Sequence, residues 1–551
     1  MIRGGADPQK ACDAQILPMR ADCVLVELVD LEAALDLYDA LLRRNLLGIR
    51  ELIPAARTLM IEFDPSVLST AMLNAAIADL DLSRTGPALG PLLEIPVCYE
   101  GEDLPEVAAL LGMTPQEVVR LHTGHDYLVA FTGFAPGFAY LTQGDERLSV
   151  PRRQSPRTLV PAGSVGLAGA FSGVYPKASP GGWQLIGRTP LDMFDIAREP
   201  VSLLQPGQRV RFCDMATDHA YTIQTRSSGP SFATRPATVP TDGQTAIEIV
   251  SVGLPVLFQD LGRSGLVHQG IGRSGAADRK SFAAANRLVG NPDNTVALEI
   301  PLGGLSFRMH GQGVMAMTGA QARVSVATAE GAAIEAPHHC AFAVEDGDLV
   351  TLGIATSGMR SYLAIRGGFY VAPVLKSCAT DMLAQIGPEP LRVGEFISIS
   401  NVQAGSHSAV ALLQEPEFAM PRAGETVRLD VVLGPRTDWF TPDAIESFLA
   451  QDWTVSLQSS RVGMRLEGDA LERSIVKELP SEATIRGAIQ VPASGQPVLF
   501  LVDHPLTGGY PVIANIAGHH LDLAGQIPVG TRIRFVASAP FATQPIAGRQ
   551  Q

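Results

Sequence analysis

Apolar and polar residues form two kinds of pattern in the first 92 residues of the chain. The segments "CVLVELVD" and "TLMIEFDP" are apolar runs of strand length. The segments "LEAALDLYDALLRR" and "SVLSTAMLNAAIADLDL" repeat apolar residues every three or four positions, as amphipathic helices do. Strand, helix, strand and helix in this order predict a small α+β cap domain over 22–92, with both helices on one face of the sheet. Residues 1–21 are expected to form a tail.

The pattern of apolar residues changes after residue 93. One helical stretch covers 103–124, where Thr114 before Pro115 is typical of a helix start. Short strands punctuated by glycine and proline follow, which predicts a barrel over 93–225. The remaining expected divisions are a Ser/Thr/Pro/Gly-rich linker at 226–245, a second β-rich domain at 246–540 with helices at 277–290 and 441–451, and a tail at 541–551.

Three short patterns occur twice in the same order. "SPGGWQLIGR" at 179–188 is echoed by "LTGGYPVIAN" at 506–515. "VPAGS" precedes the first and "VPASG" precedes the second, while "LLQPGQRVRF" and "QIPVGTRIRF" follow them. Ordered matches with small length differences predict that one β-rich unit was duplicated.

Composition narrows the class of protein. The chain has 551 residues, 46% hydrophobic and 18% charged, with a net charge of −14, which excludes a nucleic-acid binder. It has no apolar run of membrane-spanning length and no leader-like start, and its six cysteines form no CxxC pair, so we expect a cytoplasmic protein without membrane contact. Arginine far outnumbers lysine, which suits planar recognition of carboxylate or phosphate. His338, His339 and Cys340 are adjacent, and strand alternation would separate them, so no metal site is predicted.

Two stretches could carry chemistry. "FTGFAPGFAYL" combines Gly133 and Gly137 with aromatic residues, and Arg152, Arg153 and Arg157 follow closely. Flexible glycine corners beside guanidinium groups suit an anionic or strongly polar substrate, although a packed aromatic core with surface arginines is an equal alternative.

The second stretch, "GIGRSGAADRK", has GxGxxG spacing without the βαβ context of a dinucleotide fold. We expect Ser274 to cap a helix beginning near Ala276, so that the helix N–H groups and Arg273 form an anion-binding point. Asp278 in the first turn would favour the helix dipole. No P-loop and no GxSxG elbow occurs, and the candidate general bases are His122, His125, Asp260, His268, Asp503 and His504.

With these residues assembled, the chain resembles two families that are usually encoded side by side. "HTGHDYLVAFTGFAPGFAYL", "PRRQSPRTLVPAGSV" and "YPKASPGGWQLIGRTP" look like the allophanate hydrolase subunit 1 family, which is also the family of the 5-oxoprolinase B subunit. "VLFQDLGRSGLVHQGIGRSGAADR", "SSRVGMRLEG" and "IQVPASGQPVLFLVDHPLTGGYP" look like the allophanate hydrolase subunit 2 family, that of the 5-oxoprolinase C subunit. The resemblance covers about 22–225 and 247–540.

The resemblance implies an α+β, mainly β fold with a cyclophilin-like β-barrel in each half and a ferredoxin-like α+β cap. It implies a component of an ATP-dependent 5-oxoprolinase, which opens 5-oxoproline to glutamate with a separate A subunit, using ATP with Mg²⁺. The expected catalytic residues are His122, Asp278 and Asp503. The expected substrate-binding residues are Gly133, Phe134, Pro136, Gly137, Phe138, Arg153, Arg157, Gly181, Gly182, Trp183, Gln184, Arg273, Ser274, Arg461, Arg465, Thr507, Gly508, Gly509 and Tyr510.

Two alternatives stay open. The same pair of domains resembles the carboxyltransferase portion of urea carboxylase, acting on urea or a related amide. None of the lysines is flanked by methionines, so biotin would not be attached here and a separate carboxybiotin carrier would be needed. Relatives of the 5-oxoprolinase B subunit are also described as inhibitors of a sensor histidine kinase. The chain departs from the families at "PVLKSCATD" (373–381), and His504 stands where an Arg is commoner.

Overall fold

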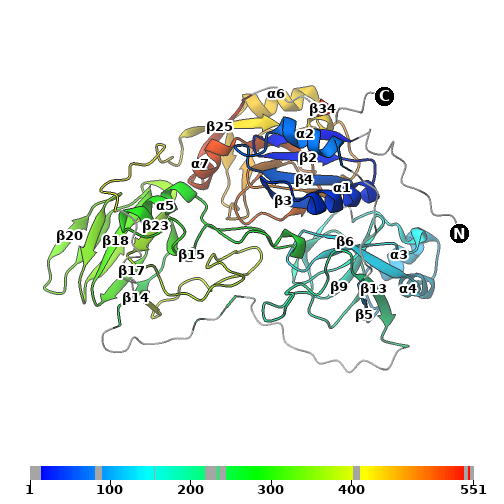
Figure 1. Ribbon diagram of the computed structural model, residues 1–551, viewed down its shortest axis with the longest axis horizontal. Helices are drawn as coiled ribbons and strands as arrows, with labels where there is room; N and C mark the ends of the chain where they lie inside the picture. The colour runs from blue at the N-terminus through cyan, green and yellow to red at the C-terminus, as the bar shows by residue number, and fades with distance from the viewer. Residues whose placement is uncertain are drawn as a thin grey trace.

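The computed structural model describes residues 14–80, 90–153, 155–217, 232–233, 235, 244–400, 410–538 and 544–545. The largest hydrophobic cores lie in a small α+β cap, a first barrel, a β-sandwich and a second barrel (Figure 1). Most of the expected linker at 226–245 lies outside the described residues. Within the described ranges, no helix combines the length and the apolar character needed to cross a membrane.

The cap is a sheet with the strand order β3-β4-β2-β1-β34, covered on one face by two helices. Asp30 and Ser69 begin these helices, since their side chains accept the N–H groups of Ala33 and Met72. The bounds are β1 Gln15–Arg20, β2 Cys23–Glu27, α1 Leu31–Arg44, β3 Ile49–Pro54, β4 Thr58–Phe63, α2 Thr70–Ala78 and β34 Gln544–Pro545.

Strand β1 lies in the segment expected to be a tail, so that expectation is wrong for residues 15–20. Ile16 and Leu17 are 1% and 3% exposed and belong to different cores on the two faces of the sheet. Pro18 lacks an N–H, and the pairing register with β2 shifts between Pro18 and Arg20. Proline and arginine interrupt the apolar pattern, which hid the strand in the sequence.

The first barrel is a curled seven-stranded sheet with two helices where one helical stretch was expected. Gly112 separates the helices with a φ of 65°, and Thr114 forms the expected helix start, a capping box with Glu117. The bounds are β5 Leu92–Val97, α3 Leu104–Leu111, α4 Pro115–Thr123, β6 Asp126–Thr132, β7 Ala139–Thr142, β8 Arg157–Val160, β9 Ser164–Ala168, β10 Phe171–Val174, β11 Ser179–Gly181, β12 Gln184–Arg188 and β13 Arg209–Asp214, with the 3-10 turn η2 at Glu146–Leu148.

The second half has two cores, one in a β-sandwich and one in a closed barrel. The sandwich elements are β14 Ala246–Ser251, β15 Leu257–Gln259, η3 Val267–Gln269, α5 Arg279–Leu288, β16 Ala297–Pro301, β17 Ser306–His310, β18 Gly313–Gln321, β19 Val324–Ala327, β20 Ala333–Ala336, β21 Ala341–Val344, β22 Leu349–Leu352, β23 Ser357–Ile365 and β24 Phe396–Ser398. The barrel elements are β25 Thr426–Leu433, η4 Thr437–Trp439, α6 Pro442–Ala450, β26 Trp453–Val455, β27 Gly463–Glu467, β28 Glu482–Ala483, β29 Ala488–Gln490, β30 Val498–Phe500, β31 Thr507–Gly508, β32 Val512–Ile516, η5 Gly518–His520, α7 Leu521–Gly525 and β33 Arg532–Ala537.

The two barrels share one topology. The first sheet runs β5-β13-β6-β7-β10-β9-β12, and the second runs β25-β33-β26-β27-β30-β29-β32 before β32 closes onto β25. In each barrel, the two strands that come first and last along the chain pair in parallel: β5 with β13, and β25 with β33. Each barrel also has a separate two-stranded sheet, β8 with β11 in the first and β28 with β31 in the second. The expected mainly β fold, with related barrels in the two halves and a small α+β cap, is confirmed.

Two of the three repeated patterns mark equivalent positions. Gly181 ends β11 and Gly508 ends the equivalent β31, and the later pattern leads into β13 and into β33. The "VPAGS" and "VPASG" pair is wrong as evidence, because the first precedes β9 whereas the second follows β29. Strand order, rather than that pair, establishes the repeat.

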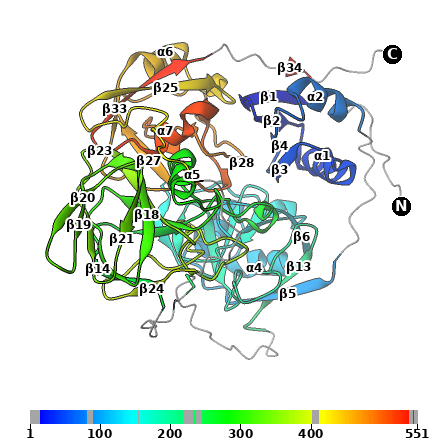
Figure 2. The ribbon, with the colours of Figure 1, turned by 60° about the vertical axis from the view of Figure 1, so that its left-hand side comes forward.

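The cap packs on the second barrel as well as preceding the first. The sheet face opposite the helices buries Leu17, Met19 and Leu25 together with Ile485 and Leu506 of the second barrel. Figure 2 shows the cap beside both barrels, with the sandwich on the other side. The N-terminal half of the chain therefore contributes to the core between the halves.

Candidate active site between the two halves

The glycine-rich loop of the first barrel touches the second barrel directly. The N–H of Phe134 donates to Thr507 Oγ1 at 2.9 Å, and Tyr140 Oη lies 3.3 Å from the same oxygen. A Cβ at Gly133 would lie 2.5 Å from Thr507 Oγ1. The structure thus brings together Gly133, Phe134 and Thr507, which come from opposite halves of the sequence.

The same loop also packs against the GxGxxG segment. The N–H of Gly137 donates to the carbonyl of Gln269 at 3.3 Å, and Pro136 beside it is buried. A Cβ at Gly270 would lie 2.9 Å from the carbonyl oxygen of Ala135. We call the contact formed by residues 131–138, 262–275, 377–385 and 503–510 the seam.

The aromatic residues of the first barrel form a core. The rings of Phe138 and Trp183 are 5.2 Å apart, and those of Phe138 and Tyr175 are 5.4 Å apart. A Cβ at Gly181 would lie 2.4 Å from Tyr175 Oη, so this glycine allows close packing. Gln184 is 3% exposed and donates to the carbonyl of Pro151. The turn at 181–184, which includes Gly182, therefore packs on this aromatic cluster rather than on Thr507.

Arg153 and Arg157 converge on one buried carboxylate. Both donate to Asp103 Oδ1 at 2.7 Å, and Asp103 Oδ2 accepts the N–H of Leu185 at 2.7 Å. The carboxylate of Asp103 raises the pKa of Arg157. This arrangement anchors α3 to β12 and engages one terminal nitrogen of each arginine, whereas Arg153 Nε and Arg157 Nη1 have no partner among the described residues.

A buried charge network occupies the second-half side of the seam. Ser274 Oγ donates to Asp503 Oδ1 at 2.7 Å, and Arg461 Nε donates to Asp503 Oδ2 at 2.9 Å. Arg461 also donates to Glu299 and, at 2.7 Å, to the carbonyl of Gly275. The structure therefore gathers three of the expected site residues, Ser274, Arg461 and Asp503, and joins them to Glu299, a carboxylate that the sequence did not single out.

Electrostatic compensation keeps this network charged. Burial alone would lower the pKa of Arg461, but Asp503 and Glu299 outweigh it and raise that pKa. Burial alone would raise the pKa of Glu299, but Arg461 and Arg360 outweigh it and lower that pKa. The network is thus a set of fixed charges held 1–7% exposed at Asp503, Glu299 and Arg461.

Three side chains that sequence reasoning missed border the network, namely those of Arg263, Lys177 and Asp381. Arg263 is 2% exposed, and its Nε and Nη1 have no hydrogen-bond partner among the described residues. Lys177 of the first barrel donates to the carbonyl of Leu383, which places it at the loop that follows Asp381. Arg263 ends "QDLGR", Lys177 ends "YPK" and Asp381 ends "CATD". All three lie in segments where the chain resembles its families or departs from them, which is the signal that could have identified them.

Burial shifts the pKa values of Asp381 and Lys177 toward neutral pH. Burial, followed by repulsion from Asp503, raises the pKa of Asp381 to about 7. Burial lowers the pKa of Lys177 to about 8, and Asp381 opposes that shift. A carboxyl group and an amine with pKa values near neutrality have the properties of general acids and bases.

His122 lies in the interior of the first barrel. Its Nδ1 is 2.7 Å from Tyr99 Oη, its Nε2 is 2.8 Å from Ser172 Oγ, and its ring stacks on Phe212. Burial lowers the pKa of His122 to about 3. These contacts use both ring nitrogens in packing and favour a structural role over the catalytic one we expected.

Asp278, rather than Ser274, begins α5, so the expected cap is wrong. The Asp278 side chain accepts the N–H of Ser281 at 3.0 Å and is itself fully buried, with a pKa that burial raises to about 6. Glu299 and Asp522 accept N–H groups at the start of the helix, and Tyr362 Oη accepts another. The expected anion point at these N–H groups is therefore already filled by side chains of this chain.

The remaining expected residues are Arg273, Arg465, Gly508, Gly509 and Tyr510. Arg273 is exposed and donates to the carbonyl of Leu261, and Arg465 is exposed on β27. Gly508 pairs with β28, and the Tyr510 ring lies 5.9 Å from the guanidinium of Arg473. A Cβ at Gly509 would lie 2.1 Å from Arg152 Nη1, another close contact between the halves.

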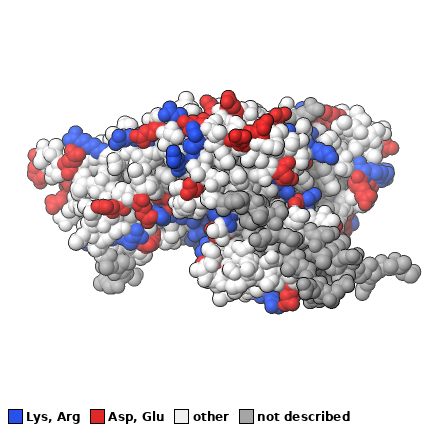
Figure 3. All heavy atoms as spheres, turned by 90° about the horizontal axis from the view of Figure 1, so that it is seen from above, with Lys and Arg blue, Asp and Glu red and all other residues white. Residues whose placement is uncertain are grey.

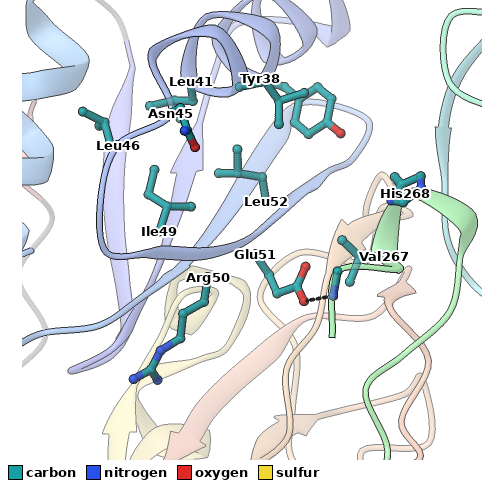
Figure 4. A pocket seen from close by; sticks show the side chains of 12 residues that line it. Tyr38, Leu41, Asn45, Leu46, Ile49, Arg50, Glu51, Leu52, Val267 and His268 are labelled. Atoms are coloured by element: carbon teal, nitrogen blue, oxygen red, sulfur yellow. Dashed lines mark hydrogen bonds between the residues drawn. The ribbon is translucent and has the colours of Figure 1, made fainter. Parts of the chain in front are cut away.

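A pocket of about 240 Å³ opens between the cap and the segment 265–268 (Figure 4). Leu41, Ile49 and Leu52 form an apolar wall, and the Glu51 carboxylate accepts the N–H of Gly265 at 2.8 Å. Burial raises the pKa of Glu51. The imidazole of His268, an expected general base, lies on the opposite wall.

The histidine pair at 338–339 does not lie in a strand. Both residues occupy the turn between β20 and β21, with ring centroids 5.8 Å apart, so strand alternation is the wrong reason for separating them. In the parts of the chain that the structure describes, the His, Cys, Asp and Glu side chains that lie close enough in a group of at least three to share an ion are Asp430, His519 and His520.

Two family descriptions match the two halves. "Carboxyltransferase domain, subdomain C and D" matches residues 14–204, and "Carboxyltransferase domain, subdomain A and B" matches residues 269–537. The chain belongs to the carboxyltransferase-domain family. The crystal structure of TTHA0988 in space group P212121 is similar throughout, with 33% identity, a TM-score of 0.79, and coverage of 93% of this chain and 99% of that one.

Named relatives divide along the same line. The second half is 36% identical to the 5-oxoprolinase C subunit of Escherichia coli (strain K12) over 295 residues, 53% of this chain and 90% of that protein. A shorter stretch is 49% identical to the 5-oxoprolinase B subunit of Bacillus subtilis (strain 168) over 135 residues, 24% of this chain and 56% of that protein. Urea amidolyase of Saccharomyces cerevisiae (strain ATCC 204508 / S288c) is 34% identical over 309 residues, but this chain covers only 16% of it.

Proposed function

We propose that this chain is the fused B and C component of an ATP-dependent 5-oxoprolinase. The observation that carries the proposal is that one polypeptide joins a half similar to the B subunit with a half similar to the C subunit, and that expected site residues of the two halves meet at the seam. A separate A-type subunit would complete the enzyme, and a cytoplasmic location is part of the same proposal.

The reaction explains why the seam would contain these groups. A lactam carbonyl is a poor electrophile, and phosphorylation of its oxygen would make the ring carbon more electrophilic. Water would add to that carbon, the ring C–N bond would break to free the amine, and a second water would release phosphate from the acyl phosphate that remains. ATP supplies a transferable phosphoryl group when it is bound. The residues of the chain would bind the lactam, hold its carboxylate, and move a proton.

The residues at the seam fit those tasks. The buried guanidinium of Arg263 has two N–H positions without a partner in the described ranges, and a carboxylate or phosphate oxygen would satisfy them. Asp381 offers a carboxyl group that changes charge near neutral pH, and its oxygens are of the type that Mg²⁺ prefers. The fixed charges of Asp503 and Arg461 would position the Ser274 hydroxyl beside the same loop.

A carboxyltransferase is the second candidate, because the family description and the similarity to urea amidolyase favour it. In that case the same seam would hold an amide substrate and receive a carboxyl group from a separate carboxybiotin carrier. Binding to a sensor histidine kinase without turnover stays a prediction.

The test is ATP hydrolysis by the purified full chain with 5-oxoproline, in the presence and absence of a purified A-type subunit. We expect 5-oxoproline to stimulate hydrolysis and glutamate to accumulate when the A-type subunit is present. Absence of both effects, together with carboxylation of urea by added carboxybiotin, would replace the proposal with the second candidate. The variant Arg323→Gln should behave like the unmodified chain in this assay, because Arg323 is exposed on the sandwich and pairs with Glu335, away from the seam.

A further inference from the structure

Three arginines from two segments of the chain lie where the cap, the sandwich and the second barrel meet. Arg279 is the first residue of α5, Arg273 lies in the loop before it, and Arg486 lies between β28 and β29. Arg20 of the cap joins them, because its Nη1 donates to the carbonyl of Arg486 at 2.9 Å. Both ribbon views place α5 beside α7, which carries the neighbouring Asp522 (Figures 1 and 2).

Hydrogen bonds fix the positions of two of these arginines. Arg486 Nη2 donates to the carbonyl of Ala277 at 2.6 Å and to Asp522 Oδ1 at 3.1 Å. The backbone N–H of Arg279 donates to the same Asp522 oxygen at 3.2 Å. One carboxylate oxygen therefore ties both residues to one place.

The side chains at this place have unused donors. Nε of Arg279 and Nε of Arg486 are both buried, and neither has a hydrogen-bond partner among the residues described here. A buried N–H without an acceptor costs free energy, and two such groups on residues that share Asp522 suggest an acceptor that both could use. The Arg486 side chain is 12% exposed, whereas Arg273 is exposed to solvent.

The charge at this place is also incompletely balanced. Burial, then repulsion from Arg486 and Arg273, lowers the pKa of Arg279 to about 9, and the attraction of Asp522 and Glu62 does not cancel this. The chain as a whole carries a net charge of −14, and acidic and basic side chains are interspersed over the face seen in Figure 3. The excess of positive charge is thus local.

We propose that Arg273, Arg279 and Arg486 form a binding site for a small oxyanion, either a phosphate group or a carboxylate. A guanidinium presents paired N–H donors that match two oxygens of either group. The oxyanion would accept the free Nε–H groups and reduce the repulsion between the arginines. The site does not depend on the 5-oxoprolinase proposal. It adjoins the seam through His504, which follows Asp503 and whose pKa is lowered to about 4 by burial and, to a smaller extent, by the charge of Arg486.

The experiment measures anion binding to the full chain by titration calorimetry and by thermal melting at low salt. Pyrophosphate and inorganic phosphate form one arm, and 5-oxoproline and acetate form the other, so that the preferred arm identifies the source of the oxyanion. We expect saturable binding in one arm, weakened at least tenfold by Arg279→Gln and by Arg486→Gln. Arg323→Gln is the control here as well, because Arg323 is 73% exposed.

Melting in the absence of anion separates a binding role from a structural one. Arg279→Gln removes a charge that its surroundings disfavour, so its melting temperature should equal or exceed that of the unmodified chain while the anion-induced rise disappears. A lower melting temperature with an unchanged anion-induced rise would overturn the proposal, as would the failure of all four anions to bind saturably. If Arg486→Gln does not fold, the Arg279→Gln result decides alone.

Discussion

Replacing Arg461 by Met should destabilise the junction between the sandwich and the second barrel. Met has a similar volume, so the change removes the charge and its hydrogen bonds while leaving little empty space. Asp503 and Glu299 are 1% and 2% exposed; Asp503 would lose the guanidinium that pairs with it, and Glu299 would keep only Arg360, at 3.5 Å. Breaking a buried ion pair in this way costs about 3–5 kcal/mol.

The partners that remain set the expected value within that range. Asp503 keeps the Ser274 hydroxyl at 2.7 Å and the N–H of Met382 at 3.0 Å. Glu299 keeps Tyr362 Oη at 2.8 Å and Nε of Arg360 at 3.5 Å. These donors offset part of the loss, so we expect about 3 kcal/mol, which lowers the melting temperature of a domain of this size by roughly 6–12 °C.

The pKa of Glu299 determines how the stability loss caused by Arg461→Met should change with pH. In the unmodified chain Arg461 holds the pKa of Glu299 below its ordinary value of 4.5, so its contribution is fully present above that pH and is lost only as pH falls through the lowered pKa. Without Arg461, Arg360 alone would oppose the effect of burial, so the pKa of Glu299 would rise, and the penalty would be relieved as the pH of the assay is lowered from about 8 to about 5. The difference in melting temperature should therefore shrink over that interval.

The assay is thermal melting at four pH values across that interval, with Arg465→Met as the matched control on β27. The control should shift stability by less than about 0.5 kcal/mol, because its side chain is exposed. If Arg461→Met melts within about 1 °C of the unmodified chain, or if the difference grows as pH falls, the account of the buried network is refuted.

The remaining predictions concern three other positions. Gly133→Ala would place a Cβ 2.5 Å from Thr507 Oγ1 and should lower the melting temperature, whereas Gly182→Ala, with 3.8 Å to its nearest neighbour, should have little effect; equal shifts in differential scanning fluorimetry would contradict this. Asp278 has a folded pKa raised from 3.8 to about 6, so stability falls as pH rises through that window, and Asp278→Asn should flatten this slope in urea unfolding unless the helix start itself fails. Asp381→Asn should remove an ionisation near pH 7 from the pH–rate profile of the assembled enzyme, and an unchanged profile would assign that ionisation elsewhere.

Local patterns predicted the elements that depend on nearby residues. The cap helices, the start of α4 at Thr114 and the α5 and α6 segments follow from periodicity and capping, which act within a few residues. The repeat was visible because tight turns with glycine pairs constrain sequence strongly. Strand β1 escaped because Pro18 and Arg20 interrupt its apolar pattern.

Contacts between distant segments were beyond local reasoning. Glu299 lies in an apolar strand, and nothing near it in the sequence shows that Arg461 is its partner. Lys177 and Asp381 acquire their shifted pKa values only because folding buries them at the seam. Conversely, His122 looked reactive in its glycine-rich surroundings, but long-range packing against Phe212 placed it inside the barrel.

We propose that the two halves form one site for a lactam that is opened at the expense of ATP. The most direct measurement is glutamate release from 5-oxoproline by the full chain mixed with a purified A-type subunit and ATP, with Asp503→Asn measured in parallel. We expect release that requires all three components and falls at least tenfold with Asp503→Asn. Release at the same rate without the full chain would contradict it.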